Sequence, residues 1–285
     1  MIGGRVGATA TTQSTSADEG DIVSQLQNAE TPLLELSGAQ GHRTACRLRS
    51  WERSLRRSRL SLTRRDRPRT FVLGGLEWDL FDEVFAPVYS PSTQVALDLL
   101  GLDPRQTSAR RSGSFLEIGC GTGAVAVLAA LAGCERVTAS DISPQAVANA
   151  AANAERHGVG DRIRTLRSDI FSGIDEGERF DTVFWSSNYV LGPDSYEYRS
   201  VHERAFVDTG YRSHRRYVEQ ALRRITPGGT ALLHFSDRGD VSALHRIADD
   251  CGRELRVLKS VPVHESQYGD DVVEHMLIEI LPTTR

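Results

Sequence analysis

The sequence of 285 residues has few cysteines and no long apolar run. Its four cysteines are scattered without a CxxC pair, which argues against a disulfide framework or structural zinc and favours a reducing compartment. No segment approaches the ~18 consecutive apolar residues of a membrane span, and no apolar signal core opens the chain. No HxH, HExxH or paired-carboxylate motif points to a metal site. These absences predict a cytoplasmic protein without membrane contact or a bound metal.

The composition that remains suits one large domain with an appendage, because 39% hydrophobic and 25% charged residues over this length can bury a substantial core. Charge is divided unevenly along the chain. Residues 42–70 hold eleven arginines against two acidic residues, whereas the rest of the chain is acidic. An acidic body opposes attraction to nucleic-acid phosphates, so a nucleic-acid partner is not expected unless the arginine segment acts as an arm.

We predict a domain boundary at Thr70, with residues 1–69 as an N-terminal arm or lid and residues 70–285 as the main domain. Residues 1–41 are low in complexity apart from one amphipathic segment, so this part is expected to be helical or partly disordered. The stretch RLRSWERSLRRSRL predicts a helix that packs on the body through Leu48, Trp51 and Leu55 while its arginines stay solvated.

The main domain shows alternating strand and helix patterns after a hairpin signal at Gly74-Gly75. Such alternation predicts an α/β, Rossmann-like, seven-stranded mixed sheet, mainly parallel, with helices on both faces and an antiparallel C-terminal hairpin at one edge. The expected strands are 115–119, 136–141, 162–169, 180–187, 230–236, 254–263 and 272–281. The expected helices are 124–133, 144–158, 214–225 and 240–252, and a long polar loop occupies 192–214.

The stretch FLEIGCGTG predicts a ligand site, because a strand runs through Gly119, Gly121 and Gly123 directly into a helix. Such a turn presents backbone N–H groups at a helix start. With Ala124 it also satisfies the relaxed GxGxxA dinucleotide pattern, so the glycines alone do not identify the ligand. Asp141 ends the next strand, where its carboxylate can accept hydrogen bonds from both ribose hydroxyls of either kind of cofactor.

Two further acidic residues separate the possible cofactors. A charge at Glu117 would repel a pyrophosphate on the loop but suits the ammonium and sulfonium of S-adenosylmethionine. Asp169 can accept from an adenine amino group, with Ile142 and Ile170 on the two faces of the base. The set favours S-adenosylmethionine over NAD, and the alternative is that Glu117 and Asp169 only cap the loop and a turn.

The chain resembles class I S-adenosylmethionine-dependent methyltransferases over residues 70–282, particularly the release-factor glutamine methyltransferases. The resemblance rests on VFAPVYSPST, LEIGCGTG, SDISPQAVANAAANAERHG, SDIF, FDTVFWSSNYV and ITPGG. It implies that the glycine loop and Glu117 contact the cofactor's aminoacyl part, Asp141 its ribose and Asp169 its adenine. Thr93 falls where the family has a threonine near the cofactor.

The sequence departs from this family after the fourth strand, where those enzymes carry Asn-Pro-Pro-Tyr to hold the acceptor amide. Here Ser186 replaces the asparagine, Asn188 replaces the second proline, and Tyr189 is kept. Glutamine methylation therefore does not follow from the resemblance. Ser186, Asn188 and Tyr189 are the candidate catalytic residues, and the rings of Tyr89, Tyr189 and Trp185 are candidate contacts for the sulfonium or the acceptor.

Three enzymatic functions remain open, and a non-enzymatic cofactor-binding module is a fourth, less favoured interpretation. The first is methylation of a small molecule at nitrogen or oxygen in specialised metabolism, because the body is acidic and the amide motif is altered. The second is methylation of a protein or RNA, with the N-terminal segment as recognition arm. The third is use of the aminocarboxypropyl arm of the cofactor, which releases methylthioadenosine. His234 and His275, inside strand patterns, are expected to be structural, and the oligomeric state is left open.

Overall fold

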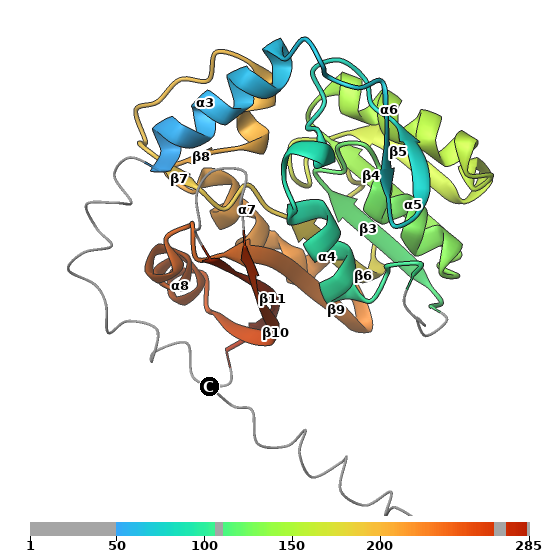
Figure 1. Ribbon diagram of the computed structural model, residues 1–285. Coiled ribbons are helices and arrows are strands. Elements are labelled where there is room, and N and C mark those ends of the chain that lie inside the picture. The colour runs from blue at the N-terminus through green and yellow to red at the C-terminus, as the bar shows by residue number, and fades with distance from the viewer. Residues whose placement is uncertain (1–49, 106–110, 265–271, 284–285) are drawn as a thin grey trace, which may run out of the picture. The chain divides into compact units, whose positions relative to one another are not determined.

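The computed structural model describes residues 50–105, 111–264 and 272–283, and its centre is a seven-stranded mixed sheet (Figure 1). The strand order is β10-β11-β9-β6-β3-β4-β5. The parallel strands are β3 (Ser114–Ile118), β4 (Arg136–Asp141), β5 (Ile163–Arg167), β6 (Phe180–Ser186) and β9 (Ile225–Ser236). β11 (Val272–Pro282) runs antiparallel to β9 and to β10 (Arg253–His264). The predicted fold class is confirmed.

Helices cover both faces of this sheet, which explains why every residue of β3 is buried. One face carries α4 (Ser92–Leu100), α5 (Ala124–Leu131) and α6 (Pro144–Arg156), and the other carries α7 (Arg212–Gln220) and α8 (Val241–Asp250) (Figure 1). The sequence of α5, AVAVLAAL, is apolar all round because the helix lies between the sheet, α4 and α6.

The predicted hairpin is present as β1 (Thr70–Leu73) and β2 (Leu76–Asp79), joined through Gly74 and Gly75 at φ of 61° and 79°. Two asparagines of α6 hold the hairpin. Asn153 Oδ1 accepts from the Asp79 backbone N–H at 2.8 Å. The side-chain amide groups of Asn149 and Asn153 both donate to the Asp79 carbonyl. This anchor fixes the start of the following segment, which includes the short helix η2 (Pro87–Tyr89).

The predicted arginine-rich helix is α3 (Ser50–Thr63). It packs on residues 187–211, which are called the segment after β6. Leu55 lies in a small apolar cluster with Val190 and Val207, and Trp51 contacts Tyr196 with ring centroids 5.4 Å apart. The docking predicted for Trp51 and Leu55 is therefore present. Leu48 and the predicted amphipathic segment within residues 1–41 lie outside the described residues.

The region between β6 and α7, expected to be a plain loop, is structured. It contains β7 (Leu191–Gly192) and β8 (Asp208–Thr209), which pair in parallel, and the short helix η4 (Val201–Ala205). Two element boundaries also differ from expectation. The helix expected over 214–225 is α7, which begins at Arg212 and is followed from Ala221 by the short helix η5 (Ala221–Arg224). The strand expected over 230–236 begins earlier, at Ile225, because Ile225 already pairs with Phe180 of β6 before a register shift. A further short helix, η3 (Gly160–Arg162), precedes β5.

None of the helices in the described ranges is long and apolar enough to cross a lipid bilayer.

Candidate active site

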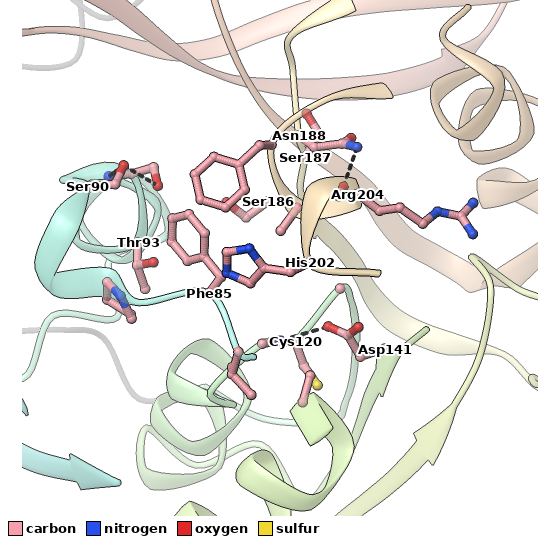
Figure 2. A pocket seen from close by; sticks show the side chains of 18 of the residues that line it. Phe85, Ser90, Thr93, Cys120, Asp141, Ser186, Ser187, Asn188, His202 and Arg204 are labelled. Carbon is pink, nitrogen blue, oxygen red and sulfur yellow. Dashed lines mark hydrogen bonds between the residues drawn. The ribbon is translucent and has the colours of Figure 1, made fainter. Parts of the chain in front are cut away.

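A cavity of about 480 Å³ lies at the carboxyl ends of β3, β4 and β6 (Figure 2). In a parallel sheet the loops at this edge come from neighbouring strands, so residues distant in sequence meet there. Its walls come from the glycine loop, residues 83–93, the segment after β6, and facing residues of α3 and η4. The cavity is lined by twelve of the thirteen predicted site residues: Tyr89, Thr93, Glu117, Gly119, Gly121, Asp141, Ile142, Asp169, Ile170, Ser186, Asn188 and Tyr189.

Gly123 is the predicted loop residue that does not line the cavity. It begins α5 at φ of 79°, and a Cβ built there would lie 2.7 Å from the Ala150 Cβ and 2.8 Å from its Cα. The glycine is therefore needed for the left-handed turn and for the close packing of α5 on α6. Its role is to shape the loop, while Gly119 and Gly121 present their backbone to the cavity.

Glu117 is 2% exposed and holds the first turn of α5, because its carboxylate accepts from the Ala126 backbone N–H at 2.9 Å. Burial raises the pKa of Glu117 well above its usual range, the Ala126 N–H lowers it, and the nearby Asp141 raises it further. The residue therefore caps a helix and also lines the cavity. A bound ammonium would stabilise the charged carboxylate, so this position fits an aminoacyl cofactor.

Asp141 links two loops at the end of β4 (Figure 2). Its Oδ2 accepts from the Gly121 N–H at 3.0 Å, and its Oδ1 accepts from the Ser143 N–H at 2.9 Å. Burial raises the pKa of Asp141, while the backbone donors of Ser143, Gly121 and Ile142 lower it. These bonds fix the carboxylate beside the glycine loop, where a ribose would lie in the predicted arrangement.

Asp169 has partners that the sequence did not predict. Its carboxylate lies 3.0 Å from Arg216 Nη1 and 3.7 Å from Arg204 Nη2. The Arg216 guanidinium also donates to the Asp169 carbonyl at 2.7 Å. Ile142 and Ile170 line the same part of the cavity, and Ile170 has a φ of 56°. The adenine contact of Asp169 stays a prediction, and the two arginines compete for its carboxylate.

The three candidate catalytic residues lie at the end of β6 or just after it and line the cavity. Figure 2 labels Ser186 and Asn188. Ser186 Oγ lies 2.9 Å from Nδ1 of the buried His234. The Asn188 amide group donates to the carbonyls of Arg204 and Val207 at 2.6 and 3.0 Å. Asn188 therefore braces the η4–β8 segment against the end of β6. The Tyr189 carbonyl accepts from the Tyr211 hydroxyl at 2.5 Å, which fixes the backbone of the same turn.

Trp185 is 5% exposed and packs between the rings of His214 and Tyr217, with centroids 4.7 and 5.2 Å away. It also lines the cavity beneath Gly119, where a Cβ would lie 3.2 Å from the indole Nε1. Both interpretations of this residue, as part of the core and as part of the site, therefore apply.

Sequence reasoning missed the wall made by α3 and η4. Ser54, Arg57 and Ser61 of α3 line the cavity. His202 of η4 and Phe85 also line it, and Figure 2 labels both. No motif marks these positions, because they come together only when α3 packs on the segment after β6. The link is a hydrogen bond of 2.7 Å between Ser58 Oγ and His202 Nδ1.

His202 makes folding sensitive to mild acid. Burial lowers the pKa of His202 from 6.5 to about 4, Arg67 lowers it further, and the Val84 carbonyl opposes the shift. Between pH 6.5 and 4 the unfolded chain binds a proton that the folded chain does not, so stability falls as pH falls. When the pH is lowered from 7 to 4, we expect the free energy of unfolding of wild type to fall by about 2 kcal/mol more than that of His202→Gln. Urea unfolding at both pH values measures this, and parallel losses in the two proteins would contradict it.

The comparisons with known proteins identify the family of this chain. A methyltransferase domain model matches residues 115–205. The release factor glutamine methyltransferase of Agrobacterium fabrum is 34% identical over 186 residues, 60% of this chain and 61% of the relative. That of Bordetella pertussis is 30% identical over 61% of this chain and 67% of the relative. The ribosomal protein uL3 glutamine methyltransferase of Burkholderia pseudomallei is 31% identical over 50% and 51% of the two chains.

The fold also has solved counterparts. The tRNA m1G37 methyltransferase of M. jannaschii superposes with a TM-score of 0.50 at 13% identity, covering 76% of this chain and 57% of the other. The chain belongs to the class I S-adenosylmethionine-dependent methyltransferases, in the group that resembles release factor glutamine methyltransferases. S-adenosylmethionine is thus the cofactor of its class, as the sequence predicted. The chain spans about half to two thirds of the length of these curated relatives.

The prediction of a small-molecule acceptor in specialised metabolism is wrong, and so is the predicted small-molecule partner. The three curated relatives from Agrobacterium, Bordetella and Burkholderia are named for protein substrates, a release factor or ribosomal protein uL3. The error came from treating an altered acceptor motif and an acidic body as evidence about the size of the substrate. Neither property limits the size of the molecule that carries the acceptor group.

Proposed function

We propose that this protein transfers a methyl group from S-adenosylmethionine to a nitrogen atom of a protein substrate. One observation carries the proposal: Glu117 and Asp141 meet the glycine loop at one end of a cavity whose other end is the segment from Ser186 to Tyr189. A cofactor held by the acids would direct its reactive end toward that segment. The names of the relatives support a protein as the acceptor.

The residues of the site act mainly by binding and orientation. S-adenosylmethionine, when bound, supplies a methyl group on a positively charged sulfur. Asp141 orients the ribose, Glu117 offers its carboxylate to the ammonium, and Ile142 and Ile170 enclose the base. The acceptor nitrogen then lies between Ser186 and Tyr189, in line with the methyl group. The wall of α3 and η4 keeps water out, because displacement is fastest when the reacting atoms are aligned and dry.

The N-terminal segment belongs to the same proposal. In this proposal α3 forms part of the substrate-facing wall, and residues 70–285 form the methyltransferase domain. Support comes from α3, whose Ser54, Arg57 and Ser61 line the cavity while Arg53 and Arg56 are exposed to solvent. A protein of the translation machinery as substrate would place the enzyme in the cytoplasm.

The test uses the purified full chain, deuteromethyl-labelled S-adenosylmethionine, and unmethylated release factor and ribosomal protein uL3 made by cell-free translation. We expect labelled methyl groups on a protein nitrogen and formation of S-adenosylhomocysteine, both by mass spectrometry. Binding of the cofactor by calorimetry without transfer to either protein would refute the proposal. Formation of methylthioadenosine would refute methyl transfer itself.

A further inference from the structure

Three polar side chains on adjacent strands form a hydrogen-bonded line that leads from the cavity into the sheet. Ser186 Oγ of β6 lies 2.9 Å from His234 Nδ1 of β9, and His234 Nε2 lies 3.0 Å from His275 Nδ1 of β11. Both histidines are 0% exposed, and Ser186 alone of the three lines the cavity. The line therefore has one open end, at the acceptor side of the site.

The protonation of His234 decides what Ser186 offers to the cavity. Burial, helped by His275, lowers the pKa of His234 to about 3, so the ring is neutral near pH 7 and carries one proton on its two nitrogens. With that proton on Nε2, His234 donates to His275 and its Nδ1 accepts the Ser186 proton. The Ser186 lone pairs are then left for the cavity. The titratable groups in contact with His234 are His275 and the Tyr189 ring, which lies edge-on at 6.4 Å.

We propose that Ser186, His234 and His275 form a proton-accepting relay, and that the methyl acceptor is a primary amine of a protein, a lysine side chain or an N-terminal amino group. This inference rests on the proposed function and narrows its substrate class. A lysine amine has a pKa of about 10.4 and arrives protonated at neutral pH, so it must lose a proton before its lone pair can attack. A carboxamide nitrogen arrives neutral and does not need that step.

The shape of the site agrees with an amine. A serine hydroxyl that donates to His234 directs two lone pairs in tetrahedral directions, which suits a tetrahedral nitrogen. A planar carboxamide would need coplanar oxygens to hold its two N–H groups. The Asn188 amide group cannot supply a donor for a carboxamide oxygen, because it is bound to the carbonyls of Arg204 and Val207.

Each proton transfer of the relay has a donor and an acceptor among the amine, Ser186, His234 and His275. An ammonium proton passes to Ser186 Oγ, the Ser186 proton passes to His234 Nδ1, and the His234 Nε2 proton passes to His275 Nδ1. The amine is left neutral, and His275 holds the proton as an imidazolium. The amine nitrogen then bonds to the methyl carbon, and the electrons of the breaking carbon–sulfur bond stay on sulfur. After the product leaves, the stored proton returns along the same path to water in the cavity, because the methylated amine is already positively charged and has no free lone pair.

The tautomer of His234 tests the relay without a substrate. In ¹⁵N NMR of the full chain at pH 7, we expect His234 Nδ1 to be unprotonated and Nε2 to carry the proton. Ser186→Ala should shift the Nδ1 resonance, because the serine hydroxyl no longer donates to it. A proton on Nδ1 would overturn the inference, since Ser186 would then accept from the histidine and have no use as a proton acceptor.

The modified atom tests the substrate class. Release factor and ribosomal protein uL3 labelled by the enzyme are digested and sequenced by tandem mass spectrometry. A methyl group on a lysine or on the N-terminal amine is expected. A methyl group on glutamine would overturn this inference and leave the proposed function standing, whereas no label on either protein overturns the proposed function.

The pH dependence of the rate separates a relay from a structural role. We expect Ser186→Ala and His275→Phe to lower kcat about 100-fold at pH 7, a usual size for a lost proton acceptor. The loss should shrink to less than about 10-fold at pH 10, where much of the amine is already neutral. His245→Asn, on α8, is the histidine control and should follow wild type. An equal loss at both pH values, with unchanged cofactor affinity, would overturn the relay.

Discussion

Replacing Asp141 by alanine is expected to raise the dissociation constant of S-adenosylmethionine at least about 100-fold. The two carboxylate oxygens of Asp141 accept hydrogen bonds from the Gly121 and Ser143 backbone N–H groups. In the proposed complex they also accept hydrogen bonds from the ribose hydroxyls. Each hydrogen bond to a charged group contributes about 1.5–3 kcal/mol, so loss of two of them accounts for the expected change. Titration calorimetry measures the dissociation constant directly.

Two further variants make this result specific. Asp141→Asn keeps one acceptor oxygen and should weaken binding by about 10-fold, which is one hydrogen bond rather than two. Asp161→Asn changes an exposed acid in η3 and should bind as wild type does. If Asp141→Ala binds within threefold of wild type, the acid at the end of β4 does not hold the cofactor, and the proposed orientation of the ligand fails.

Replacing Asp208 by asparagine is expected to lower the free energy of unfolding by about 3 kcal/mol at pH 7, because a buried carboxylate loses hydrogen bonds that contribute about 1.5–3 kcal/mol each. The Asp208 carboxylate is buried with His214, and their Oδ2 and Nδ1 atoms are 2.7 Å apart. It also accepts from the backbone N–H groups of Ser213 and His214. An amide would set two N–H groups against these donors. Denaturant unfolding measures the loss.

The matched control is Asp250→Asn, because the Asp250 carboxylate also has a side-chain partner at 2.7 Å, the Arg215 guanidinium, but on the surface. Exposed pairs contribute about 0–1 kcal/mol, so this variant should lose little. Burial raises the pKa of Asp208, but the hydrogen bonds from His214 and the backbone lower it by more. The net shift of this pKa is therefore downward. The difference between wild type and Asp208→Asn should therefore shrink in acid, as pH falls through that lowered pKa. Equal losses for the two variants would contradict the assignment.

Much of the fold could be predicted from sequence, because strand and helix periodicity alternates clearly after Thr70. The glycine loop and the acids Glu117 and Asp141 were predictable for the same reason. Each lies at a strand end, and strand ends of a parallel sheet meet at one edge. The wall of α3 and η4 was not predictable, because no pattern in Ser58 or His202 announces a contact across 144 positions.

The histidine relay shows the same limit from inside the sheet. His234 and His275 look structural because each sits in an apolar strand, and both are indeed buried. Their link to Ser186 depends on strand order, since β11 follows β10 in sequence but lies between β10 and β9. Sequence predicts that these strands exist, but the pairing that brings two imidazoles to hydrogen-bond distance is a property of the assembled sheet.

The order of the last strands also constrains how the chain assembles. β10 leaves the ribosome before β11, but among the described strands its one neighbour in the sheet is β11. Its backbone N–H and C=O groups therefore have no ladder to join until the following strand has been made and inserted beside β9. The nascent protein must hold this segment unpaired for that interval, and the proposed proton relay through His234 and His275 can form only after β11 has docked on β9.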